Sequence, residues 1–185
     1  VNIESGVTAD MNKSGQSLIN NGTWTLAGGA SMGFSSTATL EQRGGTFNNE
    51  TSEFTFYNCL IARNRATGDD SKGGGCYTHG GEGQLRIYSC TIVSNSVKTA
   101  GRGGGIARNY NTMSLANTIV YFNMAGSAEN NISLFNGATV SATYTCTRSP
   151  GLSGTGNTPL DPQFVNLAAS NYTLKVFSPC VDTGN

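Results

Sequence analysis

Two adjacent carboxylates, Asp69 and Asp70, are the residues of this sequence whose types and spacing could most directly do chemistry. Lys72 follows them, and the only histidine of the chain, His79, comes a few residues later. Paired carboxylates can bind Ca²⁺, or can act as acid and base on a sugar. Asp69, Asp70 and His79 are therefore the candidate catalytic residues, and Ca²⁺ is the one cofactor that they suggest.

The same segment also fits an ordinary solvated turn, and we favour that interpretation. Asp69 and Asp70 lie in a Gly-Asp-Asp-Ser stretch, which is common turn chemistry. If the chain repeats as described below, Lys98, Arg102 and Glu129 occupy neighbouring turns, where opposite charges can neutralise each other. No second carboxylate pair recurs one repeat away. We therefore expect no catalytic residue, no metal site and no cofactor, with an enzyme as the alternative.

Four tyrosines form a second group with chemical potential. Tyr57 and Tyr88 occupy the same position of the repeat, and Tyr110 and Tyr121 follow in the next one. A strip of outward aromatic rings can bind a sugar ring or a partner protein. It can also form a cross-strand ladder that only stabilises a sheet.

Three blocks of similar sequence position these residues. The blocks are residues 54–64, 85–95 and 113–123, offset by 31 and then by 28 residues. Such self-similarity is typical of stacked supersecondary units. A run of glycines precedes each block: Gly44-Gly45, Gly73-Gly74-Gly75 and Gly103-Gly104-Gly105.

The large apolar residues alternate within each block, and a period of two predicts strands with one buried face. A repeat of about 30 residues suits three short strands joined by turns, and no helical period is sustained. We therefore predict an all-β fold, a right-handed parallel β-helix of about five rungs. The side chains expected to point inward are Phe54, Phe56, Ile61, Leu85, Ile87, Ile92, Met113, Leu115 and Val120.

The boundaries follow from the extent of the repeat. Residues 17–145 are expected to form the rungs, and the earliest rung is inferred because Trp24-Thr25-Leu26 resembles Phe54-Thr55-Phe56. Residues 1–16 are predicted to be a lead-in strand or an incomplete rung. Residues 146–185 are predicted to form an irregular C-terminal segment.

Identical residues recur at two positions of the repeat. Asn64, Asn95 and Asn123 share one position, and Cys59 and Cys90 share another. In a coil such residues lie one above another, about 4.8 Å apart. We expect the asparagines to form a ladder of hydrogen-bonded amides at a turn. The two cysteines are expected to be stacked thiols, because disulfide geometry does not fit side chains that point in parallel.

The other three cysteines differ in position. Cys76 follows a glycine run where Ile106 does in the next repeat, which favours a core residue. Cys146 and Cys180 lie in the C-terminal segment. They could form a disulfide that closes a long loop, which is the assignment that we favour, or they could be two free core thiols.

Composition excludes several classes of protein. The formal net charge is zero and charged residues make up only 12% of the chain, whereas a nucleic-acid-binding protein needs a basic surface. No apolar run is long enough to span a membrane as a helix. Low charge and abundant Gly, Ser, Thr and Asn are typical of secreted proteins, so we expect an extracellular or cell-surface location.

A glycine entry, an asparagine exit and a distinctive tail recur in a known class of proteins. The residues concerned are Gly103-Gly104-Gly105-Ile106, the loosely matching Ile61-Ala62-Arg63-Asn64, and the tail residues Tyr144, Cys146, Asp161-Pro162, Phe164-Val165, Tyr172, Leu174, Ser178-Pro179-Cys180, Asp182 and Gly184-Asn185. Over residues 17–185 this pattern resembles the secreted right-handed parallel β-helix repeat proteins, which include the polymorphic outer-membrane protein repeat family and other bacterial extracellular β-helix proteins. The resemblance implies a protein of unassigned or adhesin-like function or, less often, a carbohydrate-active one.

We expect a non-catalytic structural or adhesive protein whose partners are other copies of itself or cell-surface and matrix glycans. If the ends of the coil are uncapped, copies would join end to end into filaments, because an exposed rung templates further strands. A domain of a longer β-helix is the rival explanation. The alternative functions are a polysaccharide lyase or hydrolase and a glycan-binding module.

Overall fold

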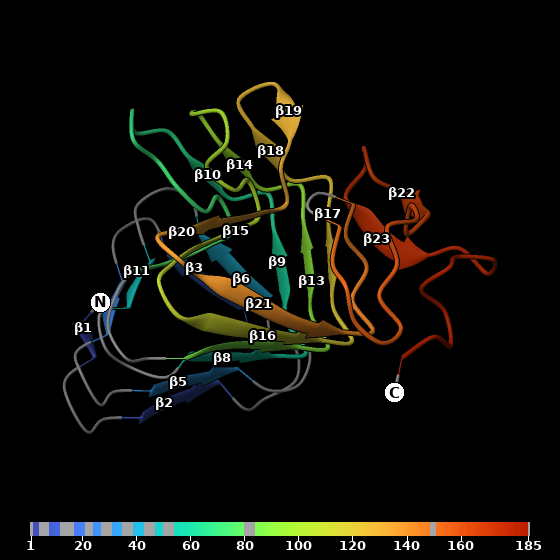
Figure 1. The fold of residues 1–185 in the computed structure, drawn as a ribbon, viewed down its shortest axis with the longest axis horizontal. Coiled ribbons are helices and arrows are strands. Elements are labelled where there is room, and N and C mark those ends of the chain that lie inside the picture. Colours follow the sequence, from blue (N-terminus) through green and yellow to red (C-terminus); the bar gives the residue numbers. More distant parts are fainter. Residues whose placement is uncertain are drawn as a thin grey trace.

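A computed structural model gives the fold of this protein (Figure 1). No helix occurs in the part of the chain that it describes, so none of those residues can cross a membrane as a helix. Side chains are described for residues 55–78, 84–148 and 151–184. The backbone is described for residues 2–3, 8–11, 17–20, 24–26, 31–34, 39–42, 47–49, 54–79, 84–148 and 151–184.

The two longest sheets are entirely parallel, and each takes one strand from every successive turn of the chain. Sheet 1 contains β2 (Thr8–Met11), β5 (Ser31–Phe34), β8 (Phe54–Tyr57), β12 (Leu85–Tyr88), β16 (Thr112–Ala116) and β21 (Thr139–Thr143). Sheet 2 contains β3 (Ser17–Asn20), β6 (Thr39–Gln42), β9 (Leu60–Ala62), β13 (Thr91–Val93) and β17 (Ile119–Tyr121).

Shorter sheets complete the turns. Sheet 3 contains β11 (Cys76–His79), β15 (Ile106–Asn109) and β20 (Ile132–Phe135). Sheet 4 contains β10 (Arg65–Ala66), β14 (Ser96–Val97), β18 (Met124–Ala125) and the antiparallel β19 (Ala128–Glu129). The N-terminal sheet contains β1 (Asn2–Ile3), β4 (Trp24–Leu26) and β7 (Phe47–Asn49). The C-terminal segment forms the hairpin of β22 (Phe164–Asn166) and β23 (Asn171–Leu174), drawn beside β17 in Figure 1.

The predicted fold class is confirmed, because the chain winds as a parallel β-helix. Ile87 pairs with Phe56 of the previous turn and with Leu115 of the next, so the offsets of 31 and 28 residues are those of the sheet. About three turns, β8–β11, β12–β15 and β16–β20, are described almost without a break, which differs slightly from the five rungs expected. Separate short strands of earlier turns extend the same sheets.

The register assigned to the first rungs is wrong. Trp24 pairs with Phe47, and Phe34 is the residue that pairs with Phe56. The early turns are shorter, since Trp24 and its partner Phe47 are fewer residues apart than Phe56 and its partner Ile87. The later turns include the sheet 4 strands β10, β14 and β18. A repeat length taken from the later turns therefore misaligned the earlier ones.

Inward-pointing residues fill the coil as the alternation predicts. Ile61, Ile87, Ile92, Met113 and Val120 are completely inaccessible to solvent. Phe56, Leu85 and Leu115 are also buried, and together these residues belong to one continuous core. The side chain of Phe54 lies outside the described residues.

The corners of the coil use left-handed backbone at residues other than glycine. Arg63, Ser94 and Phe122 have φ values of 61°, 57° and 55° at one corner of successive turns. Each directly precedes a ladder asparagine. A positive φ is uncommon for side chains of this size, so the surrounding contacts must maintain it.

Hydrogen bonds of the asparagine ladder provide many of the contacts that maintain this left-handed backbone. The backbone N–H and the Nδ2 of Asn64 both donate to Oδ1 of Asn95 at 2.9 Å. Asn95 makes the same two bonds to Asn123, at 3.0 and 2.9 Å. The Nδ2 of Asn95 also donates to the carbonyl of Ile61, and that of Asn123 donates to Ile92. The ladder therefore satisfies buried backbone groups at each corner while tying successive turns together.

The glycine runs stack for a steric reason. A Cβ on Gly74 would lie 2.4 Å from the carbonyl oxygen of Gly104, and one on Gly105 would lie 2.6 Å from that of Asn131. Backbones of successive turns approach too closely here for any side chain. In the last turn the run is replaced by Asn130 and Asn131, whose carbonyls accept the N–H groups of Gly104 and Ile106.

Cys76 provides a test of core burial through pH. Burial raises the pKa of this thiol to about 12, against the smaller opposing effect of the Arg108 charge. The folded pKa is above the unfolded value, so the stabilisation is complete below pH 9 and is lost as the pH rises toward 12. Between pH 8 and pH 10 we expect Cys76 to account for a loss of about 1 kcal/mol in the free energy of unfolding. Urea titrations at both pH values should show a smaller loss in Cys76→Ala, and an equal loss in both proteins would contradict a buried thiol.

Candidate functional site

The acidic turn lies between β10 and β11, and its carboxylates are already paired with cations. Lys98 bonds Asp69 at 2.5 Å from the next turn of the coil. Asp70 contacts Lys72 at 2.5 Å and Arg102 at 3.3 Å. Both carboxylates are largely exposed. These ion pairs are the charge neutralisation between neighbouring turns that we favoured from the sequence. Glu129, which we had placed in the same group, pairs with Arg148 instead.

Electrostatics in this turn do not favour acid catalysis. The hydrogen bond and charge of Lys72, with a smaller contribution from Arg102, lower the pKa of Asp70. A carboxyl group that serves as an acid near neutral pH needs a raised pKa. Among the residues with described side chains, no cluster of three or more His, Cys, Asp or Glu could hold a metal ion.

His79 ends strand β11, where its backbone pairs with Asn109. Its side chain lies outside the described residues, as do residues 80–83. Its proposed partnership with the acidic turn therefore stays a prediction.

Tyr57 and Tyr88 lie side by side at the ends of paired strands β8 and β12. Tyr57 is 46% exposed, and Tyr88 is partly exposed. The residue that continues this row in β16 is Ala116, so the strip comprises two rings where side chains are described. Tyr110 is 45% exposed, but it lies at a left-handed corner after β15.

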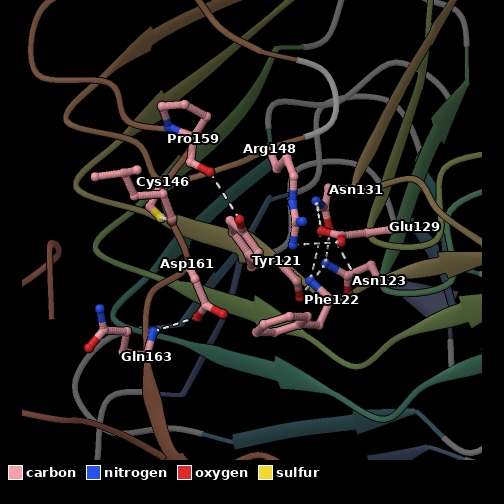
Figure 2. Close-up of polar contacts among 11 residues, drawn as sticks. Tyr121, Phe122, Asn123, Glu129, Asn131, Cys146, Arg148, Pro159, Asp161 and Gln163 are labelled. Carbon is pink, nitrogen blue, oxygen red and sulfur yellow. Dashed lines mark hydrogen bonds and ion pairs between the residues drawn. The ribbon is translucent and has the colours of Figure 1, made fainter.

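Tyr121 does not belong to an exposed strip, and its predicted role as an outward contact residue is wrong. Its side chain is fully buried, because the C-terminal segment covers this part of sheet 2. Its hydroxyl donates to the carbonyl oxygen of Pro159 at 2.9 Å (Figure 2). Phe122 lies against Tyr121 and also against Phe164 of the hairpin, with ring centroids 4.8 and 6.3 Å apart. Sequence alternation placed Tyr121 on the outer face correctly but could not reveal what covers it.

The asparagine ladder ends in a charged pair that sequence reasoning missed. Asn123 donates to Oδ1 of Asn131, and Asn131 donates to Glu129 at 2.8 Å (Figure 2). Glu129 in turn binds Arg148 at 3.2 Å, and Arg148 lies over the ring of Tyr121. The turn containing Glu129 and the C-terminal segment are thereby joined to the last corner of the coil. Neither Glu129 nor Arg148 has a counterpart in another repeat, so periodicity gave no signal for them.

A second ladder runs along the corner between sheets 1 and 2. The thiol of Cys59 donates to the carbonyl of Tyr57, and that of Cys90 donates to Tyr88. Thr118 and Thr145 make the same bond two residues back in the following turns. The row ends in the tail, where Asn157 accepts the N–H of Thr145 and donates to the carbonyl of Ala142. The predicted thiol stack of Cys59 and Cys90 is confirmed, since both are buried free thiols.

Cys146 and Cys180 are free thiols in this structure, so the disulfide that we favoured is not formed in it. The thiol of Cys146 donates to the carbonyl oxygen of Leu160 at 3.1 Å. The two cysteines border a cavity of about 400 Å³ between the second ladder and the tail, whose walls include Thr118, Tyr144 and Thr158. Cys146 is buried, and a buried position suits either a free thiol or one sulfur of a disulfide.

Comparisons with protein-family models, with curated proteins and with solved structures gave no match to this chain. The parallel β-helix is therefore established by the strand pairing of the chain itself, and the candidate site by its contacts.

Proposed function

We propose that this protein is a non-catalytic structural or adhesive β-helix of the extracellular space or cell surface. The observation that supports this best is how the polar side chains are used. The buried asparagines, threonines and thiols bond along the coil, and the acidic turn is occupied by lysine and arginine. Polar side chains used in this way stabilise a scaffold.

Membership of the polymorphic outer-membrane repeat family is a proposal of the same kind. The stacked glycine runs and the tail segment containing Asp161 and Ser178 support it. In the tail, Asp161 accepts the backbone N–H of Gln163, and Ser178 donates to the carbonyl of Pro162. Both side chains therefore stabilise turns of the tail.

Incubation with pectin, alginate and other polysaccharides separates a scaffold from an enzyme. We expect no release of unsaturated or reducing sugar ends above that of a boiled sample. Release that disappears in Asp70→Asn but persists in the exposed control Asp182→Asn would overturn the proposal in favour of a lyase or hydrolase.

Glycan binding is a second candidate, and the exposed pair Tyr57 and Tyr88 favours it. The two tyrosines are paired residues of neighbouring strands, whose backbones lie about 4.8 Å apart, so their rings can contact neighbouring units of one sugar chain. We expect Tyr57→Ala and Tyr88→Ala each to weaken retention on a glycan array about tenfold, at an estimated loss of about 1.4 kcal/mol. Tyr110→Ala is the matched control, since its ring is equally exposed at a separate corner. Equal effects of all three substitutions, or binding that none of them changes, would contradict a site at this pair.

End-to-end assembly is the third component of the proposal. Strand β21 is the last strand in the order of sheet 1, which favours addition of a strand from another copy. The tail limits this edge, because Asn157 bonds Ala142 and the carbonyl of Thr155 accepts the N–H of Tyr144. Electron microscopy of native material tests the idea. The N–H of Thr139 donates toward β16, so alternation directs the N–H of Val140 to the free edge of β21. Filaments that shorten when Val140→Pro blocks this edge are expected, and uniform short particles in both proteins would remove this component.

A further inference from the structure

Cys146 of the last turn and Cys180 of the tail border the same cavity, and the surroundings of the two thiols differ. Cys146 lies in the last turn, where its backbone bridges Ile119 and Thr158, and its side chain is 3% exposed. Cys180 lies in the tail and is partly exposed. Ser178 fixes the position of Cys180, since its hydroxyl accepts the Cys180 N–H at 3.1 Å and donates to Pro162 at 2.6 Å.

The cavity beside this pair gives a small molecule access to it. Its volume of about 400 Å³ is within the range of small-molecule sites, and both thiols border it. Cys90 borders it too, but the Cys90 side chain is only 2% exposed and its thiol already donates to a carbonyl. Cys146 is similarly buried, and its thiol donates to the carbonyl of Leu160. Cys180, which is partly exposed, is therefore the most accessible cysteine of the three.

We propose that Cys180 and Cys146 form a thiol–disulfide exchange site for low-molecular-weight disulfides that enter this cavity. In the first step the Cys180 thiolate attacks one sulfur of the small disulfide. A mixed disulfide forms on Cys180 and one small thiol leaves with the proton that Cys180 lost. In the second step Cys146, as thiolate, attacks the Cys180 sulfur, and the second small thiol leaves with the proton from Cys146. The protein loses two electrons and two protons, and the small disulfide is reduced to two thiols.

The order of attack follows from the environments of the two sulfurs. The neighbouring Cys146 side chain lowers the pKa of Cys180. The neighbouring Cys180 side chain and burial raise the pKa of Cys146. The thiolate is the attacking species, so Cys180 reacts first and Cys146 resolves the mixed disulfide. This site is independent of the proposed scaffold function.

Closing the bond would tie the tail to the last turn through a loop from residue 146 to residue 180. Such a cross-link restricts the unfolded chain and should raise the melting temperature of the protein by about 10 °C. The tail covers Tyr121 and contains the last bonding partners of both corner ladders. The disulfide would therefore hold the tail in place over the last turn of the coil.

Oxidised glutathione tests the proposal on the full chain after reduction and removal of the reductant. Peptide mapping should find Cys146 linked to Cys180, while Cys59, Cys76 and Cys90 stay free and react with a maleimide only after unfolding. In Cys146→Ser a stable glutathione adduct should accumulate on Cys180. In folded Cys180→Ser any adduct on Cys146 should form at least tenfold more slowly, and the melting temperature should no longer respond to glutathione disulfide.

Three results would overturn the proposal. The first is the absence of the Cys146–Cys180 link under conditions that oxidise a reference dithiol. The second is an adduct on Cys146 in Cys180→Ser that forms as fast as the one on Cys180. The third is a link that leaves the melting temperature unchanged. If a serine variant does not fold, brief alkylation of reduced wild-type protein decides the order, because modification of Cys146 before Cys180 contradicts it.

Discussion

Replacing Asn95 with alanine should lower the free energy of unfolding by about 4 kcal/mol. Asn95 lies in the middle of the asparagine ladder and is completely buried. Its Oδ1 accepts two bonds from Asn64, and its Nδ2 donates to Ile61 and Asn123. Alanine leaves those buried donors and acceptors without partners, and each such group costs about 1–3 kcal/mol. Urea denaturation followed by far-ultraviolet circular dichroism gives the change.

Asn58→Gly is the matched control for this substitution. Asn58 also lies at a corner with a φ of 53°, but its side chain is exposed, and glycine tolerates the same backbone. We expect its effect to be below about 1 kcal/mol. A double-mutant cycle with Asn64→Ala should show that the two losses are not additive, since the residues share bonds. A loss below about 1 kcal/mol in Asn95→Ala would mean that the ladder does not stabilise the coil.

The second large effect is expected for Gly104→Ala. A Cβ at this position would lie 2.4 Å from both the backbone N and the carbonyl oxygen of Met124 in the next turn. Met124 cannot move away freely, because its N–H donates to the carbonyl of Asn95 at 2.8 Å. We expect a loss of about 3 kcal/mol or more in the free energy of unfolding, the upper end for an overpacked site.

Gly68→Ala provides the comparison, because nothing lies within 4 Å of a Cβ there. Its expected effect lies between neutral and a gain of about 1 kcal/mol, since alanine reduces the freedom of the unfolded chain. Thermal and urea unfolding of both variants would distinguish a steric cause from a general cost of losing glycine. Similar losses in the two proteins would contradict the close stacking of turns.

The sequence predicted those features that recur from turn to turn. Asn64, Asn95 and Asn123 repeat because each performs the same task at the same corner, so identity and spacing together indicated a ladder. The inward positions of Ile61, Ile92 and Val120 followed from alternation in the same way. The glycine runs also recurred before each block in the sequence, but the close approach of backbones that requires them at Gly74 and Gly105 was seen only in the structure.

Features that occur once were not predictable by this route. Glu129 and Arg148 end the asparagine ladder, and no repeated residue points to them. Tyr121 has the alternation of an outward residue, but burial by the tail depends on contacts between segments that are far apart in sequence. The predicted alignment of Trp24 with Phe54 was wrong because the length of a turn changes along the chain. A single repeat length cannot describe both the early and the later turns.

A crystal structure of the full chain tests the central claim most directly, because the account depends on parallel turns whose corners are in register. The claim predicts Oδ1 of Asn95 within hydrogen-bond distance of the Asn64 backbone nitrogen, and Oδ1 of Asn123 likewise placed for Asn95. Ile87 should lie between Phe56 and Leu115 in one parallel sheet. Antiparallel hairpins linking residues 54–64 to 85–95, or asparagine side chains directed into solvent, would contradict it.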